Sequence, residues 1–374
     1  MSERSGLNTS YEPPATNHAR AFLVAGGGTG GHVIPGLAVA RELRQRGHAA
    51  FFIGTERGLE GKLVPREGFE LELIQIGGLK RVGLRQTAAT LLQLPVSTLH
   101  VSRLLASRHV AAVFSMGGYV AGPPVIAALV RQVPVVVMEP NAVPGFTNRR
   151  IAMYVRRALI SFPETARYFP DGRTELTGLP VREEFFSIPP KTRGGKFTVL
   201  ITGGSQGSRT LNQAARESWP LFRGAALAVR IVHQTGPPDC EELRAAFAGS
   251  GLDGEVLPFI ADMPAAFTQA DLVVCRSGAG AVAELAAAGK ASILSPFPFA
   301  ADQHQLRNAE AFVRAGAARL VEDREMTGEK LFETVAALAA DPAGLERMGA
   351  AARGIAHPGA ARRAADVLEE VARA

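Results

Sequence analysis

Two glycine-rich segments are the parts of this chain best suited to hold a phosphate group. The first runs from Gly26 to Gly31 and the second from Gly203 to Ser208. Each follows a short apolar run and leads into a helix-like stretch, the order of elements that directs backbone N–H groups at an anion. Because this unit occurs once in each half of the chain, the sequence predicts two Rossmann-like domains that face one cleft.

His32, directly after the first glycine segment, is the residue best suited to move a proton. At the start of a helix the dipole disfavours the imidazolium, so the ring is neutral near pH 7 and can act as a general base. A histidine there can also simply cap the helix. Glu139, which ends a buried apolar run beside Asn141, is the second candidate base or a support for His32. The carboxyl ends of parallel strands face the ligand crevice.

The first glycine segment also fits the G-x-G-x-x-G pattern of dinucleotide-binding enzymes. Those enzymes place an acidic residue at the end of the second strand, where it binds the ribose. Here that position is Gly54, and Glu56 comes two residues later. The sequence therefore disfavours an NAD-dependent oxidoreductase.

Apolar runs alternate with helix-like stretches along the whole chain, which predicts parallel sheets covered by helices on both faces. We expect a long helix over 86–107, interrupted at Pro95. The predicted strands are 21–25, 49–53, 71–76, 111–114, 133–138, 158–160, 197–201, 228–233, 255–259, 271–275 and 291–295.

The chain divides at Gly178-Leu179-Pro180, where the alternating pattern is interrupted before it starts again. We expect an N-terminal extension without fixed structure over 1–19, a first Rossmann-like domain over 20–177 and a second over 178–355. The amphipathic helix over 356–374 is expected to pack back on the first domain.

The distribution of charge suggests contact with a membrane surface. The chain has 374 residues and a net charge of +6, yet between Glu72 and Glu139 there is no acidic residue. The stretch 73–138 combines basic and apolar side chains, which suits anionic lipid headgroups. With 6% aromatic residues and no dense basic cluster, nucleic acid is not an expected partner. The two cysteines and the absence of an apolar leader indicate a cytoplasmic protein.

Seven motifs, in this order, resemble the motif series of the MurG family, glycosyltransferase family 28. They are GGGTGGHVIPGLAVA (26–40), MGGYVAGPP (116–124), EPNAVPGFTNR (139–149), GLPVR (178–182), GGSQGSRTLN (203–212), RSGAGAVAELAAAGK (276–290) and DQHQLRNA (302–309). The resemblance implies a GT-B fold of the α/β class, with two doubly wound Rossmann-like domains facing a cleft. It implies that the domain over 20–177 is membrane-associated and binds the acceptor, and that the domain over 178–355 binds the UDP-sugar. It implies an inverting transfer of N-acetylglucosamine from UDP to the C4 hydroxyl of undecaprenyl-pyrophosphoryl-N-acetylmuramoyl-pentapeptide, which converts lipid I to lipid II in peptidoglycan synthesis.

The same resemblance implies a cellular location and binding partners. The enzyme would lie peripherally on the cytoplasmic face of the inner membrane, with UDP-N-acetylglucosamine and lipid I as substrates. It would serve cell division and cell shape, with proteins of cell-wall synthesis and division as possible partners.

Site residues carry over where the motifs match. Arg182 would neutralise charge on the departing UDP, Glu284 would accept the ribose hydroxyls, and Gln305 would contact the sugar. The full set expected to bind UDP-N-acetylglucosamine is Thr29, Gly30, Gly31, Asn141, Arg182, Ser205, Gln206, Ile260, Ala279, Glu284 and Gln305, and the set expected to bind the acceptor is Gly117, Gly118 and Tyr119.

One departure bears on the identity of the base. The family often has His-Glu-Gln-Asn where this chain has Met138-Glu139-Pro140-Asn141, so no role of that family histidine carries over. The expected base is therefore His32, with Glu139 second.

No Asp-x-Asp metal motif is present, and the resemblance implies catalysis without metal or cofactor. Arg182 and helix N-termini would stabilise the leaving UDP instead. Two alternatives stay open: a related GT-B glycosyltransferase or UDP-sugar epimerase with another acceptor, and a UDP-sugar sensor without turnover.

Overall fold

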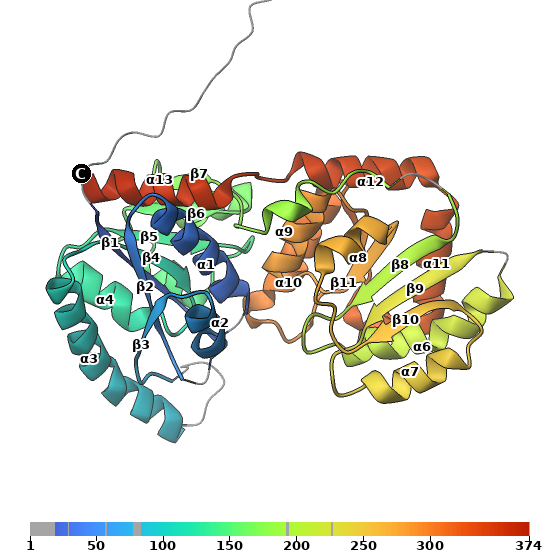
Figure 1. The fold of residues 1–374 in the computed structure, drawn as a ribbon, viewed down its shortest axis with the longest axis horizontal. Helices are drawn as coiled ribbons and strands as arrows, with labels where there is room; N and C mark the ends of the chain where they lie inside the picture. The colour runs from blue at the N-terminus through green and yellow to red at the C-terminus, as the bar shows by residue number, and fades with distance from the viewer. Residues whose placement is uncertain are drawn as a thin grey trace, which may run out of the picture.

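The computed structural model describes residues 19–28, 30–56, 58–77, 84–191, 194–225 and 227–373, and over 84–92 it describes the course of the helix only. Two parallel β-sheets, each with helices on both faces, form two halves that lie side by side (Figure 1). This is the α/β, GT-B arrangement that the motifs predict.

The first sheet has the order β3-β2-β1-β4-β5-β6-β7, and all its recorded strand pairs are parallel. Apolar runs build it because both of its faces are covered. The direction of winding reverses between β1 and β4, and ligands bind at such a switch point. The strands are β1 (Ala21–Gly26), β2 (Ala49–Gly54), β3 (Glu70–Leu73), β4 (Val110–Gly117), β5 (Val135–Glu139), β6 (Arg157–Ile160) and β7 (Thr174–Leu176).

Helices of the first half show two differences from the sequence-based expectation. Proline removes one backbone N–H without ending a well-packed helix, and α3 runs through Pro95 without interruption. The short helix α2 was not expected. The helices are α1 (Gly30–Gln45), α2 (Glu60–Arg66), α3 (Leu84–Ser107), α4 (Gly122–Val130) and α5 (Phe146–Ile151), with 3-10 turns η1 (Pro163–Tyr168) and η2 (Glu183–Phe185).

The second sheet has the order β10-β9-β8-β11-β12-β13, again parallel at every recorded pair, with its switch point between β8 and β11. The second glycine segment follows β8, as the first follows β1. The strands are β8 (Phe197–Thr202), β9 (Val229–Gln234), β10 (Asp253–Leu257), β11 (Leu272–Cys275), β12 (Ser292–Leu294) and β13 (Ala318–Leu320).

Helices of the second half agree with the sequence pattern except for α7, which was missed. They are α6 (Arg209–Gly224), α7 (Cys240–Ala248), α8 (Met263–Gln269), α9 (Ala279–Ala288), α10 (His304–Arg314), α11 (Gly328–Ala339) and α12 (Pro342–Gly354), with 3-10 turns η3 (Ala301–Gln303) and η4 (Asp323–Glu325). No helix in the described ranges is both long enough and apolar enough to cross a bilayer.

The last helix, α13 (Ala360–Arg373), returns to the first domain and packs against α1 and β4 (Figure 1, red). Its apolar face, which includes Val367 and Leu368, is fully buried in the same core as Phe22 and Leu43. Arg46, directly after α1, pairs with Asp366 of α13 at 2.6 Å. The chain therefore crosses between the two domains twice.

Candidate active site

A cleft of about 1140 Å³ lies between the two domains. Its walls bring together residues that are far apart in the sequence. Seven of the residues expected to bind the nucleotide sugar line it: Gly31, Arg182, Ser205, Gln206, Ile260, Glu284 and Gln305.

The second glycine segment presents free backbone donors to this cleft. Ser208 caps α6 by accepting a hydrogen bond from the Leu211 amide at 3.3 Å. The side chains of Ser205 and Gln206 are exposed, and their amides donate to no group in the described part of the chain. A phosphate at the start of α6 can accept these N–H groups.

Arg276 stands beside this segment and was not singled out from the sequence. Its guanidinium donates to Ser208 Oγ at 2.7 Å and pairs with Asp323 at 2.5 Å, so its side chain is only 12% exposed. It lines the same cleft. Its position one residue after β11, across the switch point from the glycine segment, is the signal that could have found it.

Glu284, on α9, is one of several acidic residues that line the cleft. Burial raises the pKa of its carboxyl to about 7, and the positive charge of Arg182 opposes that rise. Within the described residues its carboxylate has no hydrogen-bond partner, and a polar group in that state is suited to bind hydroxyls of a ligand. Arg182 is exposed, lies over the Phe185 ring at 5.0 Å and makes no ion pair within the described chain.

Ile260 and Gln305 already use some of their polar groups inside the protein. The Ile260 amide donates to Gln234 Oε1 at 2.8 Å, so in this structure it is not free to meet a uracil ring. Gln305 Oε1 accepts from the Phe297 amide at 3.0 Å, which holds the side chain at the cleft wall. Its amide nitrogen keeps both hydrogens for a ligand.

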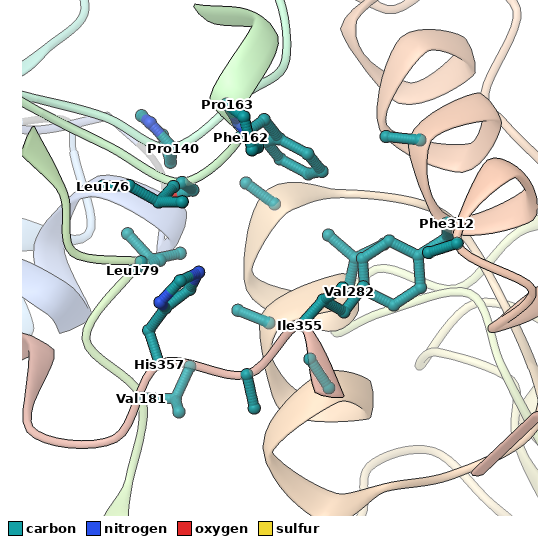
Figure 2. A pocket seen from close by; sticks show the side chains of 18 of the residues that line it. Pro140, Phe162, Pro163, Leu176, Leu179, Val181, Val282, Phe312, Ile355 and His357 are labelled. Atoms are coloured by element: carbon teal, nitrogen blue, oxygen red, sulfur yellow. The ribbon is translucent and has the colours of Figure 1, made fainter. Parts of the chain in front are cut away.

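Ala279 lines a different cavity, of about 330 Å³, at the two chain crossings. Figure 2 shows its apolar walls: Phe162 and Leu179 face Val282 and Phe312, and His357 lies at the second crossing. Gly178, with φ +72, packs against His357, where a Cβ atom would lie 2.5 Å from the histidine Cβ. This cavity is a hinge feature rather than part of the cleft.

The acceptor side of the site forms around the first glycine segment. The His32 ring lies against Gly118, and its Nδ1 lies 3.3 Å from the Gly27 carbonyl oxygen. Tyr119 lies close to Gly28, and Gly117 ends β4. The two ends of β1 and β4 thus bring His32 and the expected acceptor residues together.

The electrostatic environment keeps His32 neutral. Burial is the main cause that lowers the pKa of its imidazole, and His304 across the cleft lowers it further. The Gly27 carbonyl and the charge of Glu60 act in the opposite direction. A neutral imidazole near pH 7 can accept a proton.

Glu139 does not support His32 as the sequence suggested. Its buried carboxylate accepts from the Asn141 amide at 3.0 Å, the Gly145 amide at 3.1 Å and Asn148 Nδ2 at 2.9 Å. Burial raises the pKa of Glu139, and these hydrogen bonds lower it. Because its recorded bonds all go to its own loop, Glu139 organises the turn that carries Asn141.

That turn is joined to the second domain by a buried amide. Asn308 of α10 accepts from the Ala142 amide at 2.9 Å and donates to Asn141 Oδ1 at 3.1 Å. It also donates to the Ser277 carbonyl at 3.1 Å. Asn141 therefore lies at the contact between the domains and takes part in no wall of the large cleft.

Some expected residues cannot be placed. Thr29 and the basic residues Lys80 and Arg81 lie outside the described residues, and nothing is described of the Arg85 side chain. Gly30 begins α1. Among the residues that the structure describes, no group of three or more His, Cys, Asp or Glu side chains is arranged to hold a metal ion.

A second surface of the first domain is apolar and basic. Val96 and Leu99 of α3 are 71% and 53% exposed, and Val130 of the neighbouring α4 is 74% exposed. Arg103 of α3 and Arg131, directly after α4, are also exposed. Arg108, by contrast, is paired with Glu70 and Glu72, so its charge is already neutralised.

Comparisons with known proteins agree with this geometry. The glycosyltransferase family 28 N-terminal domain matches residues 22–160, and the glycosyltransferase family 28 C-terminal domain matches residues 198–370. A protein of Solibacter usitatus named UDP-N-acetylglucosamine–N-acetylmuramyl-(pentapeptide) pyrophosphoryl-undecaprenol N-acetylglucosamine transferase is 69% identical over 355 residues, 95% of this chain and 97% of that protein. The protein of the same name from Myxococcus xanthus is 42% identical, over 93% of this chain and 92% of its own. The crystal structure of Acinetobacter baumannii MurG superposes with a TM-score of 0.80 at 32% identity, over 94% of this chain and 99% of that chain.

Proposed function

The chain belongs to glycosyltransferase family 28, and we propose that it transfers N-acetylglucosamine from UDP-N-acetylglucosamine to the C4 hydroxyl of undecaprenyl-pyrophosphoryl-N-acetylmuramoyl-pentapeptide. The observation that carries this proposal is the 69% identity, over 95% of the chain, to a transferase named for that reaction. The cleft supports it, because backbone donors of the second glycine segment, Arg182 with Arg276, and Glu284 line one space. Among the described residues the Glu284 carboxylate has no hydrogen-bond partner.

The donor binds in the second domain. Its diphosphate accepts the Ser205 and Gln206 amides at the start of α6, with Arg276 beside them. The ribose hydroxyls donate to Glu284, and the sugar lies near Gln305 at the wall shared with the first domain. The uracil ring lies near Ile260, where the carbonyl oxygen rather than the occupied amide is its partner.

The transfer is a single displacement with inversion. The acceptor C4 oxygen forms a bond to the anomeric carbon while the bond from that carbon to the UDP oxygen breaks, and UDP leaves with the electron pair. His32 Nε2 takes the proton of the C4 hydroxyl, since Nδ1 lies at the Gly27 carbonyl. Arg182, Arg276 and the α6 N-terminus stabilise the negative charge that builds on UDP.

The acceptor approaches from the membrane along the first domain. The exposed apolar residues of α3 and α4, with Arg103 and Arg131, rest on anionic lipid at the cytoplasmic face of the inner membrane. Gly117, Gly118 and Tyr119 then hold the acceptor beside His32. Proteins of cell-wall synthesis and division are the partners to seek at this surface.

The first test is turnover. Purified protein, UDP-N-acetylglucosamine and a short-chain lipid I analogue, with no added metal, should release UDP and form a β(1→4)-linked disaccharide lipid detected by mass. Binding of UDP-N-acetylglucosamine without product on this acceptor would favour another acceptor or a sensor. Release of an epimerised sugar without acceptor would favour the epimerase alternative.

The membrane proposal has its own test. Replacing Lys80, Arg81 and Arg85 with glutamate should weaken sedimentation with anionic vesicles. The matched control carries the same charge change on the second domain, at the exposed Arg319, Arg324 and Arg347. Equal binding by both triple variants would contradict the proposed orientation.

A further inference from the structure

Glu60 is a fully buried carboxylate for which the proposed mechanism has no role. It opens α2, the helix that sequence patterns missed. Its Oε2 accepts from the Gly28 amide at 2.8 Å, and its Oε1 accepts from both the amide and the hydroxyl of Thr55 at 2.9 Å. The three partners that the described residues supply are all donors, and carboxylate oxygens accept hydrogen bonds.

The backbone around Glu60 is shaped to admit it. Gly27, Gly54 and Gly58 surround the side chain, and a Cβ atom on any of them would overlap it. Gly54 ends β2, the position where a dinucleotide-binding enzyme would carry its ribose acid. Here the acid comes from α2 and is enclosed by the first glycine segment, so it is not available to a ribose.

Glu60 is connected to His32 through two residues of that segment. It holds the Gly28 amide, and the adjacent Gly27 presents its carbonyl to His32 Nδ1 at 3.3 Å. We propose, on the basis of the proposed transfer reaction, that Glu60 is a positioning residue that holds the first glycine segment and His32 in place and supplies the negative charge that assists the base. Glu139, the carboxylate suggested by the sequence, instead bonds to its own loop.

The negative charge of Glu60 favours proton uptake by His32. His32 becomes an imidazolium when it takes the C4 proton, and a nearby negative charge stabilises that product. Glu60 raises the pKa of His32, while burial and His304, on α10 of the other domain, lower it. Among the described residues, Glu60 and His304 are the titratable groups whose charges act on the His32 ring.

The direct test is NMR titration of the His32 imidazole, assigned by the signal that His32→Gln lacks. In Glu60→Gln the pKa of His32 should fall, since the negative charge that raises it is removed. The matched control, Thr55→Val, removes one donor but keeps the carboxylate, so the pKa of His32 should stay within roughly 0.2 of the wild-type value. An unchanged or raised pKa in Glu60→Gln overturns the proposal.

This titration does not require turnover, so it separates the two proposals. Absence of product in the wild-type protein would contradict the transfer reaction and leave the titration result to decide the role of Glu60. With turnover, Glu60→Gln should lower kcat roughly 10-fold or more and move the acidic limb of the kcat profile to lower pH, while UDP binding stays unchanged. A lower kcat with an unmoved limb would mean a structural role only.

A second variant covers the case in which Glu60→Gln does not fold, judged by circular dichroism and UDP binding. Glu60→Asp keeps the charge but cannot reach both Gly28 and Thr55, which bond to opposite oxygens. We expect a several-fold lower kcat with an acidic limb within roughly 0.3 of the wild-type pH. Wild-type kcat in this variant would contradict the positioning role.

Discussion

Each of the two glycine segments connects a strand to a helix, yet their backbone N–H groups have different partners. In the first, the Gly28 amide is taken by Glu60 inside the protein. In the second, the amides of Ser205 and Gln206 face the cleft without a partner among the described residues. The first segment is stabilised by an internal carboxylate, and the second is left open for an external phosphate.

This difference shows how one structural unit serves two tasks. A segment that must bind an anion keeps its N–H groups free and places a cation, Arg276, at its edge. In the first segment, which carries the proposed base His32, a backbone amide is instead taken by the internal acid Glu60. The glycine pattern alone does not distinguish the two, because the distinguishing residues come from other elements.

Removing the base should give the largest effect and sharpen the contrast. His32→Gln keeps a polar side chain at α1 but takes no proton, so kcat should fall roughly 10²- to 10⁴-fold. UDP binding, which belongs to the second segment, should be unchanged by isothermal titration calorimetry. A kcat within roughly 3-fold of the wild-type value would mean that another residue is the general base.

Glycine-to-alanine substitutions in the second glycine segment test how closely its backbone packs against neighbouring residues. A Cβ atom at Gly207 (φ +77) would overlap the Thr235 carbonyl, whereas at Gly204 (φ +84) nothing lies within 4 Å. Gly207→Ala should lower the free energy of unfolding by roughly 3 kcal/mol, and Gly204→Ala by about 1 kcal/mol from backbone strain alone. Urea unfolding of both variants measures this, and equal losses would contradict the packing.

Substitution of Glu284 tests the proposed binding of the nucleotide sugar separately from the base. Glu284→Gln should raise the KM for UDP-N-acetylglucosamine roughly 30-fold, since two hydrogen bonds to a charged acceptor are weakened. In the wild-type protein the KM should fall as the pH rises through about 7, where the carboxyl ionises. Steady-state kinetics between pH 6 and 8, roughly one unit on either side, should show no such fall in the variant.

The same carboxyl should cost stability, and this is the smallest expected effect. Its pKa is raised from 4.5 to about 7 by folding, so the unfolded chain loses the proton first and stability falls as the pH rises between these values. Above pH 7 the penalty is constant, and Glu284→Gln should be more stable than wild type by about 1 to 2 kcal/mol. At pH 4, below both values, the two proteins should unfold at similar urea concentrations.

Most of the fold could be predicted from the sequence because buried parallel strands are continuous apolar runs. The helices α2 and α7 were missed, whereas α8, which is as short as α2, was predicted. Pro95 was misleading, because the surrounding helix tolerates one absent hydrogen bond.

Site residues that lie in the motifs could be predicted from the sequence. Residues that join the site through contacts between distant elements could not. Seven of the expected residues meet at one cleft, and all but Ile260 lie in the motifs. Ala279 faces the hinge cavity instead, and Glu139 bonds to its own loop. Glu60 and Arg276 were missed because each acts through segments far from it in the chain, Gly28 and Ser208.

The return of α13 to the first domain has a consequence for synthesis on the ribosome. Phe22 and Leu43 share their core with Val367 and Leu368. The hydrophobic core of the first domain is therefore complete only after the last helix has been translated. Roughly 180 residues separate the first crossing from α13, which at typical bacterial elongation rates is about 10 to 40 s. During that interval the nascent domain exposes the apolar groove that α13 later fills. A nascent chain stalled before Ala360 should therefore be a client for chaperones, while the second domain can already be folded.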